Sequence, residues 1–224
     1  MTNDRKHPPR HMLSNEIVRN GCYIDFEGFA GHKNRRLRPP ILLGIYNRDG
    51  NQHFRQVVFN KDFRWAAEAP GDEQSIDFCN DRDAFLKHLM KKSIRKKKPL
   101  FAFTEHELKV INKHLQQNIV RRFRNVRSIT QRWFNSRGDG SITPPSWDLA
   151  EAAKTTGITL SSKLAIGGVT SRFREVREYS CSKRKWATAP RAIRKKWREI
   201  LKHNKSDVMS IYEMMMVMRG LDES

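Results

Sequence analysis

Residues 21–27 read Gly-Cys-Tyr-Ile-Asp-Phe-Glu, an apolar run that ends in two carboxylates one residue apart. If this run is a β-strand, successive side chains alternate between its two faces, so Asp25 and Glu27 share one face. Two like charges at this separation are unfavourable unless a positive group lies between them. Hard divalent cations take oxygen ligands. The pattern therefore predicts a metal site at the end of this first strand.

The chain is strongly basic, with 44 Lys and Arg against 24 Asp and Glu in 224 residues and a formal net charge of +20. This excess favours a polyanionic partner, and we expect nucleic acid, either DNA or RNA. No apolar run approaches the roughly 20 residues that span a bilayer, and the first 20 residues lack the apolar core of a secretory signal. The three cysteines are isolated, which favours a reducing compartment. We therefore expect a cytoplasmic protein without membrane contact.

Hydrophobic periodicity predicts a flexible basic arm over residues 1–15 and one α/β domain over residues 16–224. The elements expected in its first half are strands at 21–26, 41–46 and 53–59, a helix at 81–92, a strand at 99–103 and a helix at 105–120. Those expected in its second half are a short strand at 126–130 and helices at 148–156, 190–201 and 205–218. This order is similar to that of ribonuclease-H-like domains. We predict a mixed sheet, with an antiparallel three-strand meander plus parallel strands, flanked by helices.

A second acidic motif, His203-Asn204-Lys205-Ser206-Asp207, lies near the end of the chain. The spacing of four residues places His203 and Asp207 on one face of a helix, if the helix runs through both. Asp207 could instead be an acid of the first helical turn, favoured by the helix dipole. His203 could equally be a histidine that bonds the backbone at the helix start.

Three stretches in this order resemble the DEDD-type 3′–5′ exonucleases, and in particular a predicted exonuclease branch with a ribonuclease-H-like fold. They are Tyr23–Gly28 (YIDFEG), Phe103–Leu108 (FTEHEL) and His203–Val208 (HNKSDV), and the resemblance covers about residues 20–215. It implies a nuclease in which two Mg²⁺ or Mn²⁺ ions are held by Asp25, Glu27, Glu107 and Asp207. His203 would accept a proton from the attacking water, and the products would be 5′-mononucleotides.

Two features depart from this family pattern. Three residues separate His203 from Asp207, which is the spacing of members that use a tyrosine, so the role of His203 as general base stays open. Glu105 competes with Glu107 as the middle acid, and on one helix the two side chains would point about 200° apart. Glu107 matches the motif. The alternative function is a non-catalytic nucleic-acid-binding protein that retains the fold.

Basic runs interleaved with aromatic residues predict a groove that follows phosphates and stacks bases. The runs are Arg35–Arg38, Lys91–Lys98, Arg121–Arg127 and Lys183–Arg198, and the aromatic residues are Phe123, Trp133, Trp186 and Trp197. Trp197 has helical spacing from Ile193 and Leu201, which favours a place in the core instead. The methionine-rich stretch 214–218 is also predicted to pack in the core.

Overall fold

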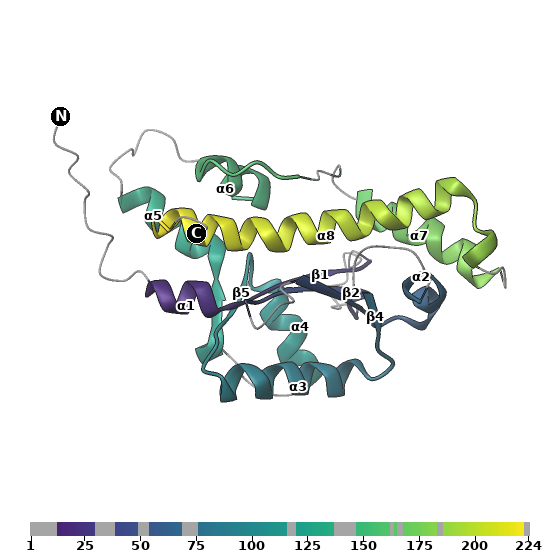
Figure 1. Ribbon diagram of the computed structural model, residues 1–224, viewed down its shortest axis with the longest axis horizontal. Helices are drawn as coiled ribbons and strands as arrows, with labels where there is room; N and C mark the ends of the chain where they lie inside the picture. Colours follow the sequence, from purple (N-terminus) through teal and green to yellow (C-terminus); the bar gives the residue numbers. More distant parts are fainter. Residues whose placement is uncertain are drawn as a thin grey trace.

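A six-stranded mixed β-sheet lies between two layers of helices in the computed structural model (Figure 1). The structure describes residues 13–29, 39–48, 54–68, 76–115, 120–136, 147–161, 164, 168–182 and 186–221. The predicted run Arg35–Arg38 and most of the predicted basic arm lie outside these residues. At the end of the predicted arm, the Ser14 hydroxyl accepts a hydrogen bond from the Ile17 amide and caps a helix that begins at Asn15.

The sheet has the strand order β4-β3-β2-β1-β5-β6. Its strands are β1 (Cys22–Glu27), β2 (Leu42–Tyr46), β3 (Phe54–Val58), β4 (Ile76–Phe78), β5 (Leu100–Ala102) and β6 (Phe123–Asn125). The β1–β2 and β2–β3 pairs are antiparallel, whereas the β1–β5, β5–β6 and β3–β4 pairs are parallel. The predicted α/β class, with a mixed sheet built on an antiparallel meander, is therefore confirmed. The finer likeness to ribonuclease H stays a prediction.

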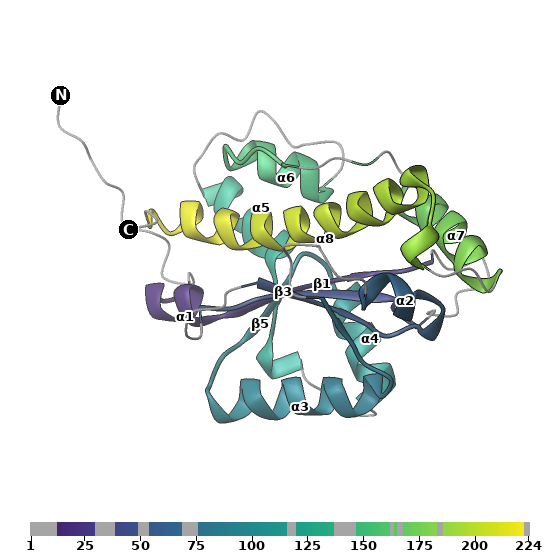
Figure 2. The ribbon, with the colours of Figure 1, turned by 45° about the vertical axis from the view of Figure 1, so that its right-hand side comes forward.

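Helices cover both faces of the sheet (Figures 1 and 2). The long α8 (Arg191–Met218) crosses one face together with α5 (Val126–Ser136), α6 (Leu149–Thr155) and α7 (Gly168–Cys181). The other face carries α3 (Arg82–Arg95) and α4 (His106–Leu115). Two short helices complete the described set, α1 (Asn15–Asn20) and α2 (Arg64–Ala67). Short 3-10 helices lie at Lys61–Phe63, Val120–Arg122 and Trp186–Thr188.

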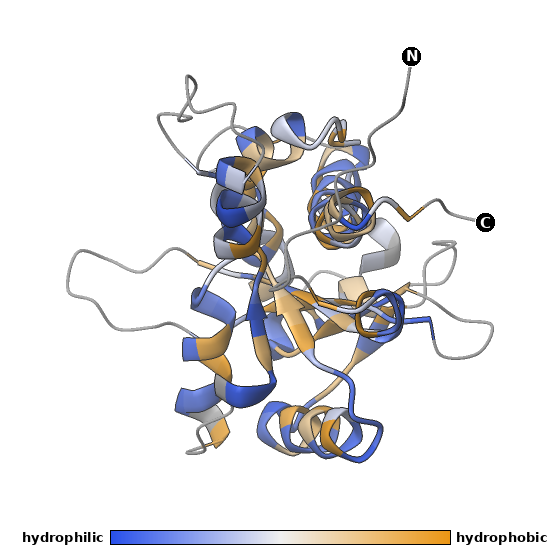
Figure 3. Cartoon of the chain, turned by 90° about the vertical axis from the view of Figure 1, so that its left-hand side faces the viewer, coloured by the Kyte–Doolittle hydropathy of each residue, from blue (hydrophilic) through white to orange (hydrophobic). Residues whose placement is uncertain are grey.

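Side-chain alternation on β1 assigns its residues to two separate hydrophobic clusters. Tyr23 packs in the cluster beneath α8, where its ring stacks on Phe101 and meets Tyr212 edge-on. Ile24 and Phe26 belong to the cluster on the α3 and α4 side. The view along the long axis shows the largely hydrophobic strands enclosed between these helices (Figure 3). Asp25 and Glu27 alternate with the second group and therefore share the α8 face with Tyr23.

The predicted strand at 126–130 is wrong, because these residues begin helix α5. The Asn125 side chain caps this helix by accepting a hydrogen bond from the Ser128 amide at 3.1 Å. Val126, Ile129 and Thr130 are buried at a spacing of three and four residues, which is a helical pattern. The strand of this region, β6, lies just before it. β-Branched residues favoured a strand locally, but burial along one helix face decided the outcome.

The two helices predicted at 190–201 and 205–218 form one continuous helix, α8, of 28 residues. No Gly or Pro interrupts the stretch between Leu201 and Lys205. Asn204, which could have marked a helix boundary, is fully buried within the helix and bonds residues of the sheet. His203 therefore lies in the middle of a helix rather than at its start.

Smaller differences between the predicted and the observed elements lie at the ends of helices and at the edge of the sheet. The helix predicted at 105–120 begins at His106, and its predicted last residue, Val120, lies in a 3-10 helix. The short edge strand β4 was not predicted, because three residues are too few for a period-two pattern. The helix predicted at 148–156 is confirmed as α6, which Asp148 caps and which stops before Gly157, whose φ of 81° suits glycine. Among the described residues, no helix is long and apolar enough to cross a membrane.

The aromatic residues that were predicted to stack on bases lie mostly inside the protein. Trp197 is 1% exposed and confirms its predicted core position. Phe123 and Trp186 are also buried, so the prediction that they form stacking platforms is wrong. Four of the five residues in the stretch 214–218 are buried, as expected for core packing. Trp65 of α2, by contrast, is 61% exposed and was not singled out.

We expect Trp197→Ala to lower the free energy of unfolding by about 3–5 kcal/mol, because it leaves a cavity beside Phe63 and Phe173. Trp65→Ala is the matched control and should change it by less than about 0.5 kcal/mol. Urea unfolding followed by far-UV circular dichroism measures both. Equal effects of the two substitutions would contradict the core described here.

Candidate functional site

The first-strand carboxylates lie under the middle of α8. Asp25 accepts a hydrogen bond from the Asn204 side-chain amide, whose Nδ2 lies 2.8 Å from Asp25 Oδ2 and 3.2 Å from its backbone oxygen. Asp25 and Asn204 are 179 residues apart in the chain. This bond therefore fixes where the late helix crosses the first strand.

Gln56 of β3 holds Asn204 in this orientation. Its Nε2 donates to Asn204 Oδ1 at 3.0 Å and to the Leu201 backbone oxygen at 2.9 Å. Gln56 and Asn204 are both fully buried. Since Asn204 Oδ1 accepts from Gln56, its amide nitrogen is the group directed at Asp25. The three residues form a polar chain across three elements.

Gly44 of β2 makes room for this chain. It is the cross-strand neighbour of Asp25. A Cβ atom at Gly44 would lie 2.4 Å from Asn204 Oδ1 and 2.8 Å from a methyl carbon of Val208. A side chain at this position would therefore push α8 away from the sheet at the point where Asn204 reaches Asp25.

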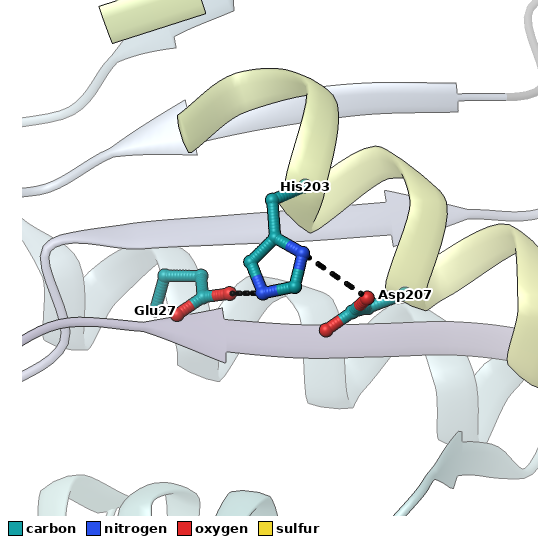
Figure 4. A group of neighbouring side chains, drawn as sticks. All are labelled: Glu27, His203 and Asp207. Atoms are coloured by element: carbon teal, nitrogen blue, oxygen red, sulfur yellow. Dashed lines mark ion pairs between the residues drawn. The ribbon is translucent and has the colours of Figure 1, made fainter. Parts of the chain in front are cut away.

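Glu27, His203 and Asp207 converge beside this contact (Figure 4). His203 lies between the two carboxylates, with Nε2 3.9 Å from Glu27 Oε1 and Nδ1 3.5 Å from Asp207 Oδ1. One potential ligand atom from each residue lies within 4.8 Å of the others. All three side chains are largely buried, with 15–17% of their surface exposed. These three side chains are potential ligands that one metal ion could bind together.

Glu107 extends the acidic group from the first turn of α4. It is 5% exposed, and its Oε2 accepts a hydrogen bond from the Thr104 hydroxyl at 3.0 Å. Burial and then the negative charge of Asp25 raise the pKa of Glu107, so the two carboxylates interact electrostatically. Glu105 is exposed instead. Of the two competing glutamates, only Glu107 faces the other carboxylates.

Burial raises the pKa of all four carboxyl groups, and the charges of neighbouring carboxylates raise those of Glu27, Glu107 and Asp207 further. Burial is the largest cause for each, and it raises the pKa of Asp25 to about 6, that of Glu107 to about 8 and that of Asp207 to about 9. The pKa of Glu27 is raised well above its usual value by burial and then by the charges of the other three. The Asn204 hydrogen bond opposes this effect at Asp25. Bound cations would relieve the repulsion.

The five residues singled out in the sequence are thus neighbours, but they are not equivalent. Glu27, His203 and Asp207 form the tight group, whereas Asp25 and Glu107 reach it through electrostatic interaction. Asp148 stays apart as the N-cap of α6. The supporting residues Gln56, Asn204, Gly44 and Thr104 were not predicted. The available signal for Gln56 was a glutamine that alternates with Phe54 and Val58 on one face of β3.

The described basic residues of the predicted runs lie on several different elements. Lys91–Lys98 ends α3 and precedes β5, whereas Thr104 and Glu107 follow β5. This run and the carboxylates therefore lie at opposite ends of the strand. Arg191, Arg194 and Arg198 are exposed on the first half of α8.

Comparison with models of known protein families finds no match to this chain, and comparison with curated proteins finds none either. The function therefore has to be inferred from the residues themselves and from their geometry.

We predict that the metal-free protein loses stability as the pH rises from 6 to 9. A carboxyl group whose pKa is raised by folding contributes its full stabilisation at a pH below its pKa in the unfolded chain, which is near 4. This contribution is lost as the pH rises through the pKa of the group in the folded protein. Asp25, Glu107 and Asp207 together place this loss between about pH 4 and pH 9. Urea unfolding midpoints measured in EDTA at several pH values test it.

Asp207→Asn should make these midpoints less dependent on pH, because it removes the carboxyl group with the highest of the three values. Asp77→Asn, on the exposed edge strand β4, is the control and should keep the original slope. A wild-type unfolding midpoint that does not change between pH 6 and 9 would contradict the burial of these carboxyl groups with raised pKa values.

Gly44→Ala should destabilise the protein by about 1–3 kcal/mol, because the added methyl group overlaps Asn204. Gly28→Ala is the matched control, since its Cβ would meet no atom closer than 3.5 Å. Thermal unfolding compares the two variants. The arrangement of α8 on β2 would be disproved if Gly44→Ala were as stable as Gly28→Ala.

Proposed function

We propose that this chain is a metal-dependent 3′–5′ exonuclease that hydrolyses phosphodiester bonds of DNA or RNA to 5′-mononucleotides. The observation that carries the proposal is a largely buried cluster of Glu27, His203 and Asp207, in a chain of net charge +20. Asp25 and Glu107 lie beside this cluster. Carboxylates are rarely buried together without a functional reason. The polarity of the reaction and the nature of the products come from the resemblance to the DEDD-type exonucleases.

The donor set suits divalent cations. Asp207 Oδ1 is buried and has no hydrogen-bond partner among the described residues, which leaves it available as a ligand. Carboxylate oxygens are the ligands that Mg²⁺ and Mn²⁺ prefer. Asp25, Glu27, Glu107 and Asp207 would hold the two ions. When bound, such ions supply Lewis-acid activation of water and neutralise charge that develops on the phosphate.

The protein side chains contribute positioning and proton transfer. Asn204 and Gln56 hold Asp25 in place, and Thr104 holds Glu107. His203 is the proton acceptor, since imidazole accepts a proton near neutral pH and Nε2 lies on the Glu27 side of the ring. Its position in the middle of α8 fixes the ring beside the acids.

A second candidate is a non-catalytic nucleic-acid-binding protein with the same fold. The position of His203 favours it, because a protonated imidazole between Glu27 and Asp207 would neutralise negative charge without a metal. In this case the basic surface would bind nucleic acid and the acidic group would only stabilise the fold.

The decisive experiment follows nucleotide release from a 5′-labelled oligonucleotide with Mn²⁺, with Mg²⁺ and with EDTA. We expect shortening from the 3′ end with either metal and none with EDTA. Asp25→Asn should lower the rate at least about a hundredfold, since loss of even an outer-sphere partner of a metal costs 10–100-fold. His203→Ala should lower it by about 10²–10⁴-fold, which is the usual contribution of a general base.

Asp77→Asn is the control and should retain the wild-type rate, because its side chain is exposed on the edge strand β4. Circular dichroism checks that each variant is folded. Persistent release of nucleotides by folded Asp25→Asn would overturn the nuclease proposal. Binding of the oligonucleotide without any release by the wild type would select the second candidate.

A further inference from the structure

A polar pocket of about 760 Å³ opens next to the acidic group. One wall comes from residues between 104 and 109, at the start of α4. The other comes from residues between 125 and 131, at the end of β6 and the first turns of α5. Its volume lies within the range of small-molecule sites. The two helices that form it are labelled in Figures 1 and 2.

The lining of the pocket suits an anion rather than an apolar ligand. Every side chain named in it is polar or charged, and none is aliphatic or carbocyclic. Lys109 from α4 and Arg127 from α5 supply two exposed positive charges from opposite walls. Glu105 is the single carboxylate among the lining residues. A phosphate group is the polar anion that such paired Lys and Arg side chains bind well.

Thr104 connects the pocket to the acidic group. Its side chain lines the pocket, and its hydroxyl donates to Glu107 Oε2 while accepting from the His106 amide at 3.1 Å. A ligand in the pocket therefore lies one side chain away from Glu107. The acidic group by itself repels a nucleic acid strand, so cations close beside it offset that repulsion.

We propose that this pocket binds a phosphate group of the polynucleotide strand, next to the phosphodiester that lies at the acidic group. This inference rests on the proposed function for the identity of the strand. Lys109 and Arg127 contact the phosphate from the two walls. Glu105 weakens the attraction and limits how tightly the strand is held.

The test compares two double variants with equal loss of charge. Lys109→Ala/Arg127→Ala removes the two cations of the pocket. Lys113→Ala/Arg132→Ala removes two exposed cations from the same helices outside the pocket lining. The probe is a single-stranded oligonucleotide labelled at its 5′ end. Fluorescence anisotropy in EDTA measures its dissociation constant between about 50 and 200 mM salt, without hydrolysis.

We expect the pocket variant to weaken binding roughly tenfold or more and the control variant less than twofold. The slope of log affinity against log salt should fall by about 0.7 in the pocket variant only, because the two cations contact one phosphate and each neutralised phosphate of a single strand contributes about 0.7. Glu105→Gln should tighten binding, since it removes the repelling carboxylate. Equal losses of affinity in both double variants, or no loss in either, would overturn the proposal that this pocket binds a phosphate group. Thermal melting confirms that the variants fold.

The outcomes separate this inference from the nuclease proposal. If the pocket variant binds weakly while the wild type releases no nucleotides, the pocket stands and the nuclease proposal fails. If the wild type releases nucleotides but the two double variants bind alike, the nuclease proposal stands and the pocket fails.

Discussion

The hydrogen bond between Asn204 and Asp25 joins the long helix α8 to the first strand, and the candidate site depends on it. It is buried and continues through Gln56 to β3, so three elements share one polar chain. An unsatisfied amide in this place would cost about 1–3 kcal/mol, which makes other positions of the helix unfavourable. Gly44 permits the close approach. The same helix position brings His203 and Asp207 over Glu27.

Four buried carboxyl groups near one another oppose folding whenever they are ionised. Burial raises the pKa of each, and the charges of neighbouring carboxylates raise the values of Glu27, Glu107 and Asp207 further. A fold selected for stability alone would place apolar residues here. Divalent cations or a protonated His203 would neutralise the group, and these two solutions correspond to the enzyme and to the binding protein. The net charge of +20 is consistent with a polyanion in either case.

Positive charge and aromatic residues play different roles in this protein. The tryptophans and phenylalanines between the basic runs mostly fill the core, which removes them as platforms for bases. Exposed cations remain on several of the described elements, and those of Lys91–Lys98 lie at the opposite end of β5 from Glu107. Lys109 and Arg127 differ from these because both line one pocket beside Glu107. Position relative to the carboxylates, rather than the number of charges in a run, is what distinguishes them.

Local sequence pattern was enough to predict the antiparallel meander, the buried strand β5, the α3 helix and the shared face of Asp25 and Glu27. The reason is that hydrophobic repeats of two residues for strands and 3.6 residues for helices can be recognised from residues close together in the sequence. The order of three acidic motifs pointed to the site residues. Local pattern failed where propensity and burial disagreed, as in α5 and in the unbroken α8. It could not reveal the chain from Gln56 through Asn204 to Asp25, or the pocket between α4 and α5. Those depend on residues far apart in sequence, and only the packing of α8 and α5 against the sheet brings them into contact.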